Sequence, residues 1–313
     1  MGLTRRRLLV ASAGLAGTLG AARAQRAVPI ADMHTHLGKQ TRAAMTLDLA
    51  ADMKANNVVL AAWAYATDRA YIKAMPDGIR QVSEPSPMKI AMAMREDMRR
   101  SRQYVKDSGL GLVLTASDVD RALTGHPSVV LAAEGTDFMQ GRMSLLDEAF
   151  DGGLRHLQLV HYTRNVVGDF QTDEPQHGGL TDFGRQLIRA AQAKGMLVDL
   201  AHCTEPGVRQ ALEVATKPMV WSHGWVDKVP GAHDDKAGWQ RRRLSLATAR
   251  EIAKAGGAFG TDIAGVGDSG SVNTYSEVQL VIQTLQRNGL DAAAIAKVSH
   301  LNYARVLRTA LTA

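Results

Sequence analysis

Cysteine and aromatic residues are scarce in this sequence. Cys203 is the single cysteine among 313 residues, so no internal disulfide can form. Aromatic residues make up 5% of the chain, and alanine, leucine, valine and methionine supply most of its apolar bulk. The length is sufficient for a full hydrophobic core, so stability does not require a disulfide.

A long basic surface is also missing. The formal net charge is +6, but the first 24 residues hold four arginines and no acid, which leaves +2 for the remainder. Arg241, Arg242 and Arg243 form only a short basic cluster. We therefore expect no nucleic-acid partner.

The N-terminal segment has the order of features typical of an export signal. TRRRLL at residues 4–9 resembles a twin-arginine motif, an apolar stretch covers 10–22, and a small-x-small pattern precedes Gln25. We predict a twin-arginine signal peptide over 1–24 and a mature domain over 25–313, located in the periplasm or secreted. The apolar stretch is too short for a stable membrane anchor. The alternative is a disordered basic tail.

Five apolar runs each end on a histidine or an acid. They cover 28–36, 129–134, 157–161, 196–202 and 218–223. Runs of this length and apolarity are typical of strands buried on both faces of a parallel sheet. Because such sheets bind ligands at the carboxyl ends of their strands, the five runs predict one metal-binding, hydrolytic site.

Helical patterns alternate with these runs, which is typical of a parallel α/β sheet. We expect seven strands in one domain, one fewer than an eight-stranded barrel needs. A long loop is expected over 225–240, and a single strand between 257 and 268. The expected helices cover 46–56, 88–106, 143–151, 182–193, 205–215, 246–255, 276–288 and 291–309.

Five residues are candidate metal ligands. His34 and His36 are two apart on a strand, so both side chains lie on one face and can reach one ion. Glu134 ends an uncharged run, where a carboxylate is costly unless it is paired or binds metal. Its two oxygens could bridge two ions, or it could pair with an arginine. His202 and His223 end the next runs and form a plausible second pair.

Three further positions could take part in the reaction. His161 could stabilise an oxyanion near the metals, and Asp262 could carry the proton from water to the leaving amine, with Asp268 as the fallback. Arg241 or Arg242 could bind a substrate carboxylate through a two-pronged contact, while at least two of the three arginines are expected to be solvated. We expect Cys203 to be a small packed residue.

These residues resemble the membrane (renal-type) dipeptidase family of zinc metallopeptidases, from about residue 30 to 307. The opening D-x-H-x-D segment, the glutamate E-G, the G-x-R-x-x-x-L-x-H strand and the closing N-x-x-R-V helix all have counterparts. The segments that carry the resemblance are DMHTHL at 32–37, AEG at 133–135, GLRHLQLVH at 153–161, GLTDFG at 179–184, VDLAH at 198–202, SH at 222–223 and NYARVL at 302–307.

The resemblance implies a distorted (β/α)8 TIM-like barrel of the amidohydrolase type, shortened near its last strands, with two zinc ions. His34, His36 and Glu134 would hold the first ion, and Glu134, His202 and His223 the second. His161 would touch the substrate, an arginine near Arg241 would meet the dipeptide carboxylate, and Asp262 would match the acid of a G-x-D-F-D-G-V motif. Two residues depart from the pattern: His36 replaces an aspartate, and Ala264 replaces the second aspartate of D-F-D-G.

The function expected from these observations is zinc-dependent hydrolysis of the amide bond of a dipeptide by a hydroxide shared between the metals. One alternative is another metal-dependent hydrolase of the amidohydrolase type, acting on a lactone, a cyclic amide or a phosphoester. A second is a catalytically idle metal-binding scaffold. The sequence leaves open the dipeptide preference and whether the chain forms a homodimer.

Overall fold

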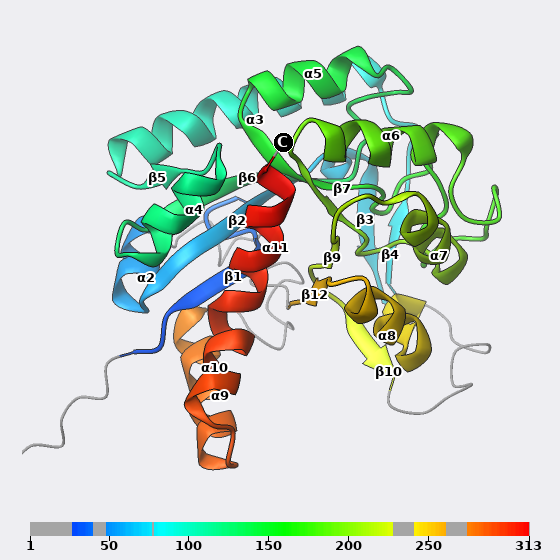
Figure 1. Ribbon diagram of the computed structural model, residues 1–313. Helices are drawn as coiled ribbons and strands as arrows, with labels where there is room; N and C mark the ends of the chain where they lie inside the picture. The colour runs from blue at the N-terminus through cyan, green and yellow to red at the C-terminus, as the bar shows by residue number, and fades with distance from the viewer. Residues whose placement is uncertain (1–26, 40–47, 77, 228–240, 261–273, 313) are drawn as a thin grey trace, which may run out of the picture.

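The centre of the fold is one curled parallel sheet. The computed structural model describes residues 27–39, 48–76, 78–227, 241–260 and 274–312. The strand order is β1-β2-β6-β7-β8-β9-β12, with β5 paired to β6 beside this path. The sheet forms a half-barrel (Figure 1), and within the described residues no pairing joins β12 back to β1. The strands are β1 (Ile30–Thr35), β2 (Val58–Ala66), β5 (Gly111–Leu112), β6 (Ser128–Glu134), β7 (Leu154–Gln158), β8 (Leu197–Asp199), β9 (Val220–Trp221) and β12 (Ala258–Phe259).

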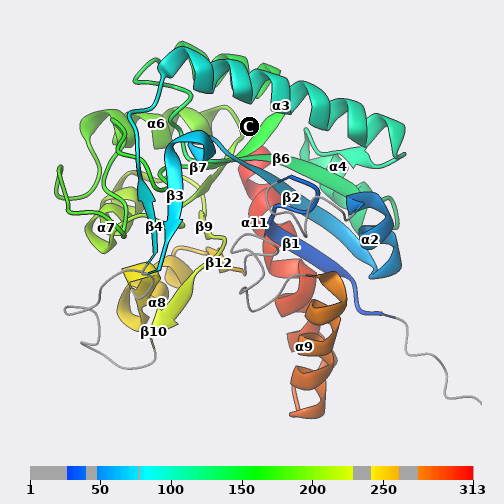
Figure 2. The ribbon, with the colours of Figure 1, turned by 180° about the vertical axis from the view of Figure 1, so that it is seen from behind.

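Helices connect successive strands and pack around the sheet. In Figure 2, α3 runs along the top of the molecule and α9 projects at the bottom. The last helix, α11, contacts β1, β8 and β12 and so packs across the opening of the half-barrel. The helices are α2 (Leu49–Ala55), α3 (Pro87–Asp107), α4 (Ala116–Leu123), α5 (Ser144–Asp151), α6 (Asp182–Ala193), α7 (Glu205–Val214), α8 (Leu246–Lys254), α9 (Tyr275–Arg287), α10 (Ala292–Ala296) and α11 (Asn302–Leu311).

The local sequence explains where these elements lie. All seven residues of β6 are buried, as expected of a central strand covered on both faces. Thr181, Thr204 and Ser245 stand immediately before α6, α7 and α8, and each side chain accepts a hydrogen bond from a backbone N–H of the first helical turn. Such caps satisfy N–H groups that have no partner inside the helix.

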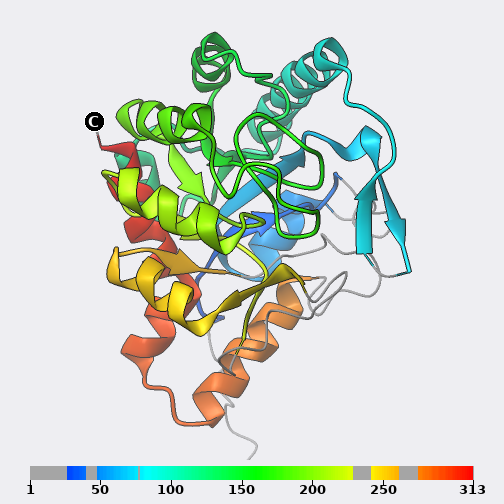
Figure 3. The same cartoon turned by 90° about the vertical axis from the view of Figure 1, so that its right-hand side faces the viewer.

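Two small strand pairs were not expected from the sequence. An antiparallel hairpin joins β3 (Ile72–Met75) to β4 (Gly78–Gln81), and Figure 3 shows it in cyan, to one side of the main sheet. A parallel pair joins β10 (Trp225–Asp227) to β11 (Arg243–Ser245). The prediction of a loop over 225–240 is therefore wrong for its first three residues, which form β10. Residues 228–240 lie outside the described part of the chain.

The prediction of an α/β barrel fold is confirmed by the curled parallel sheet and its helical connections. The expected final helix over 291–309 is divided into α10, a π-helical turn at Lys297–Leu301 and α11. None of the described helices has both the length and the apolar character needed to cross a membrane.

Candidate metal centre

Five of the predicted side chains meet where the central strands end. His34 lies on β1 and His36 directly follows it, while Glu134 is the last residue of β6. His202 and His223 lie three and two residues beyond the ends of β8 and β9, so they are on loops rather than on strands as predicted. These strands are parallel, so their carboxyl ends share one edge. All five side chains are buried, with exposed fractions of 1–2%.

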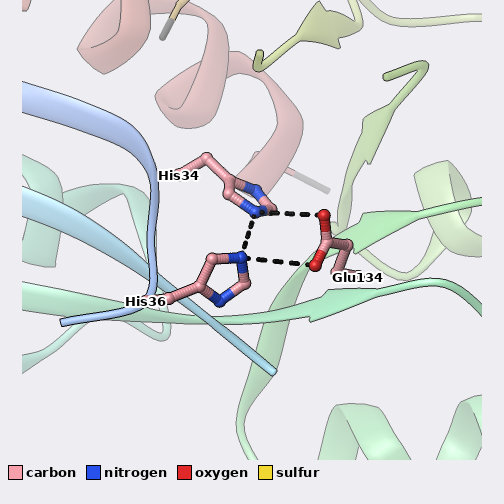
Figure 4. Close-up of side chains that lie close together, drawn as sticks. All are labelled: His34, His36 and Glu134. Atoms are coloured by element: carbon pink, nitrogen blue, oxygen red, sulfur yellow. Dashed lines mark hydrogen bonds and ion pairs between the residues drawn. The ribbon is translucent and has the colours of Figure 1, made fainter. Parts of the chain in front are cut away.

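The first half of the cluster joins β1 to β6. His34 Nε2 lies 3.4 Å from Glu134 Oε1, and His36 Nε2 lies 3.3 Å from Oε2. The two Nε2 atoms are 3.0 Å apart and each faces one oxygen of the Glu134 carboxylate, as Figure 4 shows.

The second half shares Oε1 of the same carboxylate with His34. His202 Nε2 and His223 Nε2 lie 3.5 Å and 3.4 Å from Glu134 Oε1, and 3.0 Å from each other. Glu134 therefore stands between two histidine pairs, in the position of a bridging ligand.

The donor set and its spacing fit divalent metal. Nitrogen ligands about 2.0–2.1 Å from a tetrahedral zinc ion lie about 3.3–3.4 Å from one another, and the separations here run from 3.0 to 3.5 Å. Glu134 Oε2 is buried, and no described residue donates a hydrogen bond to it. The groups with suitable geometry are His34, His36 and Glu134; Glu134, His202 and His223; and His34, Asp199 and His223.

Hydrogen bonds at Nδ1 of His36 and His223 leave the Nε2 atoms of these rings available to bind metal. His36 Nδ1 donates to the backbone carbonyl of Ala64 at 3.2 Å, which leaves the lone pair of Nε2 directed toward Glu134. His223 Nδ1 lies 2.9 Å from Ser222 Oγ, which can accept a hydrogen bond from a proton on Nδ1. Fixing the tautomer in this way is typical of metal-binding histidines.

The electrostatics of the cluster favour an ionised Glu134 and a neutral His202. Burial alone would raise the pKa of Glu134, but the surrounding imidazoles, His161 first, hold it well below its usual value. Burial, followed by the nearby Arg242 guanidinium, lowers the pKa of His202 well below its usual value. Neutral imidazole is the form that binds metal.

His161 lies beside the cluster but is held differently. The prediction that it ends a strand is wrong, because β7 ends at Gln158 and His161 lies three residues beyond it. Its Nε2 lies 3.1 Å from Glu134 Oε1, while its Nδ1 donates to Asp68 Oδ1 at 2.6 Å. Burial would lower the pKa of His161, but the Asp68 and Glu134 carboxylates raise it well above its usual value. A cationic ring there is suited to donate a hydrogen bond.

The three arginines take separate positions. Arg242 is 6% exposed, and its Nη1 donates to the Tyr162 hydroxyl at 2.8 Å. Its buried Nε has no hydrogen-bond partner among the described residues. Arg241 and Arg243 are partly exposed and pair with Glu174 and Asp227. Of the two arginines predicted to bind substrate, only Arg242 is buried beside the cluster.

Tyr162 connects Arg242 to the histidines. The centroid of its ring lies 4.4 Å from that of His161 and 4.8 Å from that of His202. A group bound by Arg242 would therefore lie close to both imidazoles.

The remaining predictions give one packed cysteine and two untested acids. Cys203 is fully buried, and burial raises the pKa of its thiol, so it is a packed residue rather than a nucleophile. Asp262 and Asp268 lie outside the described residues, so the proposed proton carrier stays a prediction.

Two aspartates of the site were missed in the sequence. Asp68 holds His161 from the end of β2, and Asp199 lies within the apolar run that leads to His202. The same signal that identified Glu134, an acid next to an apolar run, was present at both positions.

Comparison with known proteins points to one family. The family model of membrane dipeptidases, peptidase family M19, matches residues 21–232. The chain is 35% identical over 102 residues to an uncharacterized dipeptidase of Schizosaccharomyces pombe, covering 32% of this chain and 25% of that protein. It is 34% identical over 110 residues to a dipeptidase of Claviceps purpurea, covering 34% of this chain and 26% of that protein. The matched segment thus spans about a quarter of these relatives.

Solved structures share the fold at low sequence identity. A metallopeptidase from Rhodobacter sphaeroides, solved with a phosphinate mimic of the dipeptide L-Ala-D-Ala, aligns with a TM-score of 0.70 and 17% identity, covering 91% of this chain and 99% of that one. A dipeptidase of peptidase family M19 aligns with a TM-score of 0.67 and 18% identity, covering 85% of this chain and 90% of that one.

Proposed function

The chain belongs to the membrane dipeptidase family, and on that premise we propose that it hydrolyses the amide bond of dipeptides at a centre of two zinc ions. The observation that carries this proposal is the meeting of four ligand-type imidazoles on the two oxygens of Glu134, all of them buried. A carboxylate between two histidine pairs could bridge the paired ions, about 3.5–4 Å apart, of a two-metal hydrolase.

Each ion would have its own histidine pair. His34 and His36 would hold the first, His202 and His223 the second, and Glu134 would bridge them. Bound zinc polarises a carbonyl and makes water a nucleophile at neutral pH. Since His36 stands where the family pattern has an aspartate, the proposed centre has one carboxylate among its five ligands.

Residues around the cluster would bind and orient the substrate. Arg242 is the proposed partner of the dipeptide carboxylate, because its Nε is buried and no described residue accepts from it. A planar guanidinium suits a carboxylate through two parallel hydrogen bonds.

His161 would stabilise the charge that develops on the carbonyl oxygen. Its ring is fixed by Asp68, and its Nε2 points to the carboxylate at the centre of the cluster. A fixed donor aimed at a developing negative charge lowers the barrier without reorganisation during the reaction. Asp262 is the proposed carrier of the proton to the leaving amine.

The test is a substrate panel on zinc-loaded protein that begins at Gln25. Dipeptides are assayed by release of free amino acids, beside N-acetylated dipeptides, lactones and phosphoesters. We expect hydrolysis of dipeptides that a chelator abolishes and added zinc restores. Hydrolysis of only lactones or phosphoesters would favour the wider amidohydrolase class. A zinc-loaded protein that hydrolyses nothing would favour an idle scaffold.

The N-terminal segment supports a proposal about location. The order of arginines, apolar stretch and small-x-small pattern over 1–24 favours export of the folded, metal-loaded chain by the twin-arginine route. Replacing Arg6 and Arg7 by lysine should keep the chain in the cytoplasm. An unchanged distribution between cell fractions would contradict the proposal.

A further inference from the structure

One buried carboxylate connects the two loops that carry His202 and His223. Asp199 is the last residue of β8, and its exposed fraction is 0%. Its Oδ1 accepts hydrogen bonds from the backbone N–H of Ala201 and of Ser222, both at 3.0 Å. Each of these residues directly precedes one of the two histidines.

The backbone at His202 needs such support. His202 has φ +69°, a left-handed conformation that costs a residue with a side chain about 1–3 kcal/mol. Without Asp199, the N–H of Ala201 and the N–H of Ser222 would also lose the acceptor they share, in a place that water does not reach. We expect both loops to rearrange in that case, because the rearrangement would relieve the strain at His202 and give the two N–H groups other acceptors.

The other oxygen of Asp199 is already engaged. Oδ2 lies 3.2 Å from His156 Nε2, and His156 Nδ1 lies 3.3 Å from the hydroxyl of Tyr303 on α11. Both oxygens of Asp199 therefore have hydrogen-bond partners.

The first histidine pair has a comparable support on β1. Asp32 Oδ1 accepts from the backbone N–H of His34 at 3.0 Å, and its Oδ2 accepts from the Tyr275 hydroxyl at 3.0 Å. Each pair thus has its own buried aspartate behind it, and Asp199 connects the two loops that carry His202 and His223.

We propose that Asp199 is a positioning residue that fixes the loops of His202 and His223 so that both Nε2 atoms face the second metal ion. This inference rests on the proposed two-zinc centre. It assigns Asp199 a role through the backbone, although its position near His34 and His223 would also allow direct metal binding.

Zinc titration of metal-free Asp199→Asn and Asp199→Ala variants separates these roles. An asparagine keeps an oxygen that can accept from both N–H groups, so we expect it to retain both ions with less than about a threefold loss of affinity. Alanine keeps no acceptor, and we expect it to weaken the second ion about 10- to 100-fold, the range for groups that orient metal ligands. Calorimetry or competition with a chelator measures both affinities.

The ion that is lost can be identified in a His223→Ala background. There the second ion is already weakened, so adding Asp199→Ala should leave the affinity of the first ion unchanged. Asp199→Ser, whose side chain is too short to reach both N–H groups, replaces the alanine variant if that does not fold, and it should show the same loss.

Three outcomes would overturn the inference. Two ions retained at full affinity by Asp199→Ala would show that the two loops hold their positions without Asp199. An asparagine variant as weak as the alanine variant would mean that the charge, or direct binding, is what matters. Wild-type protein that binds fewer than two ions would overturn the proposed centre itself, and with it this role.

Discussion

Replacing Asp68 by asparagine should slow the reaction while leaving the metal centre intact. Asp68 is fully buried, and its Oδ1 accepts from His161 Nδ1 at 2.6 Å while its Oδ2 accepts from the backbone N–H of Tyr162 at 3.0 Å. An asparagine can keep only one of these acceptors. If its oxygen stays on Tyr162, its amide NH2 faces Nδ1, which must then give up its proton.

The expected size of the effect follows from the bond that is lost. A hydrogen bond between charged groups contributes about 1.5–3 kcal/mol. If His161 acts on charge that develops only in the transition state, this whole amount appears in the barrier. At about 1.4 kcal/mol for each factor of ten, kcat should fall about 10- to 150-fold.

The assay compares kcat, KM and bound zinc for wild type and Asp68→Asn on the best dipeptide of the panel. KM should change little and zinc content not at all, because His161 is not among the proposed ligands. A fall in kcat of less than threefold would refute the role of Asp68. A loss of zinc would show instead that the Asp68–His161 pair supports the metal centre.

The same pair makes the stability of the metal-free protein depend on pH. The Asp68 and Glu134 carboxylates raise the pKa of His161 against the effect of burial. This contribution is complete below the unfolded-state pKa of about 6.5 and is lost as pH rises through the higher folded-state pKa. Asp68→Asn should lose part of this stability, which urea unfolding at pH 6 and pH 9 would measure.

Four other changes test separate parts of the account. Glu134→Gln should bind less than one zinc ion per chain by elemental analysis, because both proposed ions share this carboxylate. Gly135→Ala should lower the free energy of unfolding by about 1–3 kcal/mol, since Gly135 has φ +92° and an added Cβ would lie 2.7 Å from Asp137 Oδ2. Gly109→Ala, with φ +72° and no atom within 4 Å of the Cβ, controls for backbone strain alone. Arg242→Met should raise KM about 10- to 150-fold through the loss of a charged contact, whereas Arg241→Met should change it less than twofold. Burial, followed by Asp68, raises the pKa of Asp137 to about 7, so its contribution to stability falls as pH rises from its unfolded value of 3.8 to about 7. The melting temperature of metal-free Asp137→Asn should therefore gain on that of wild type between pH 4 and pH 8, and a constant difference would contradict this.

Most of the fold and the meeting of five side chains in one buried cluster could be predicted from the sequence. Buried parallel strands appear as bare apolar runs, and their carboxyl ends meet at one edge whatever the details of the loops. The polar residue that ends each run is therefore placed in the site by topology alone. His36, Glu134, His202 and His223 were found in this way, and His34 by its spacing of two from His36.

The supporting residues depend on contacts between distant segments. Arg242 could not be distinguished from Arg241 and Arg243, because its burial depends on Tyr162, 80 residues earlier in the chain. The role of Asp199 depends on Ser222, which follows it by 23 residues in another loop. The hairpin of β3 and β4 lies outside the main sheet, so the rhythm of strands and helices gave no sign of it.

Zinc titration of the metal-free protein, with dipeptide hydrolysis followed at each addition, measures how many ions the proposed reaction requires. We expect activity to rise with added zinc and to reach its plateau at about two equivalents per chain, the stoichiometry of a paired-ion centre. A plateau at one equivalent would contradict the bridging role of Glu134. Two equivalents bound without hydrolysis of any dipeptide would contradict the proposed function.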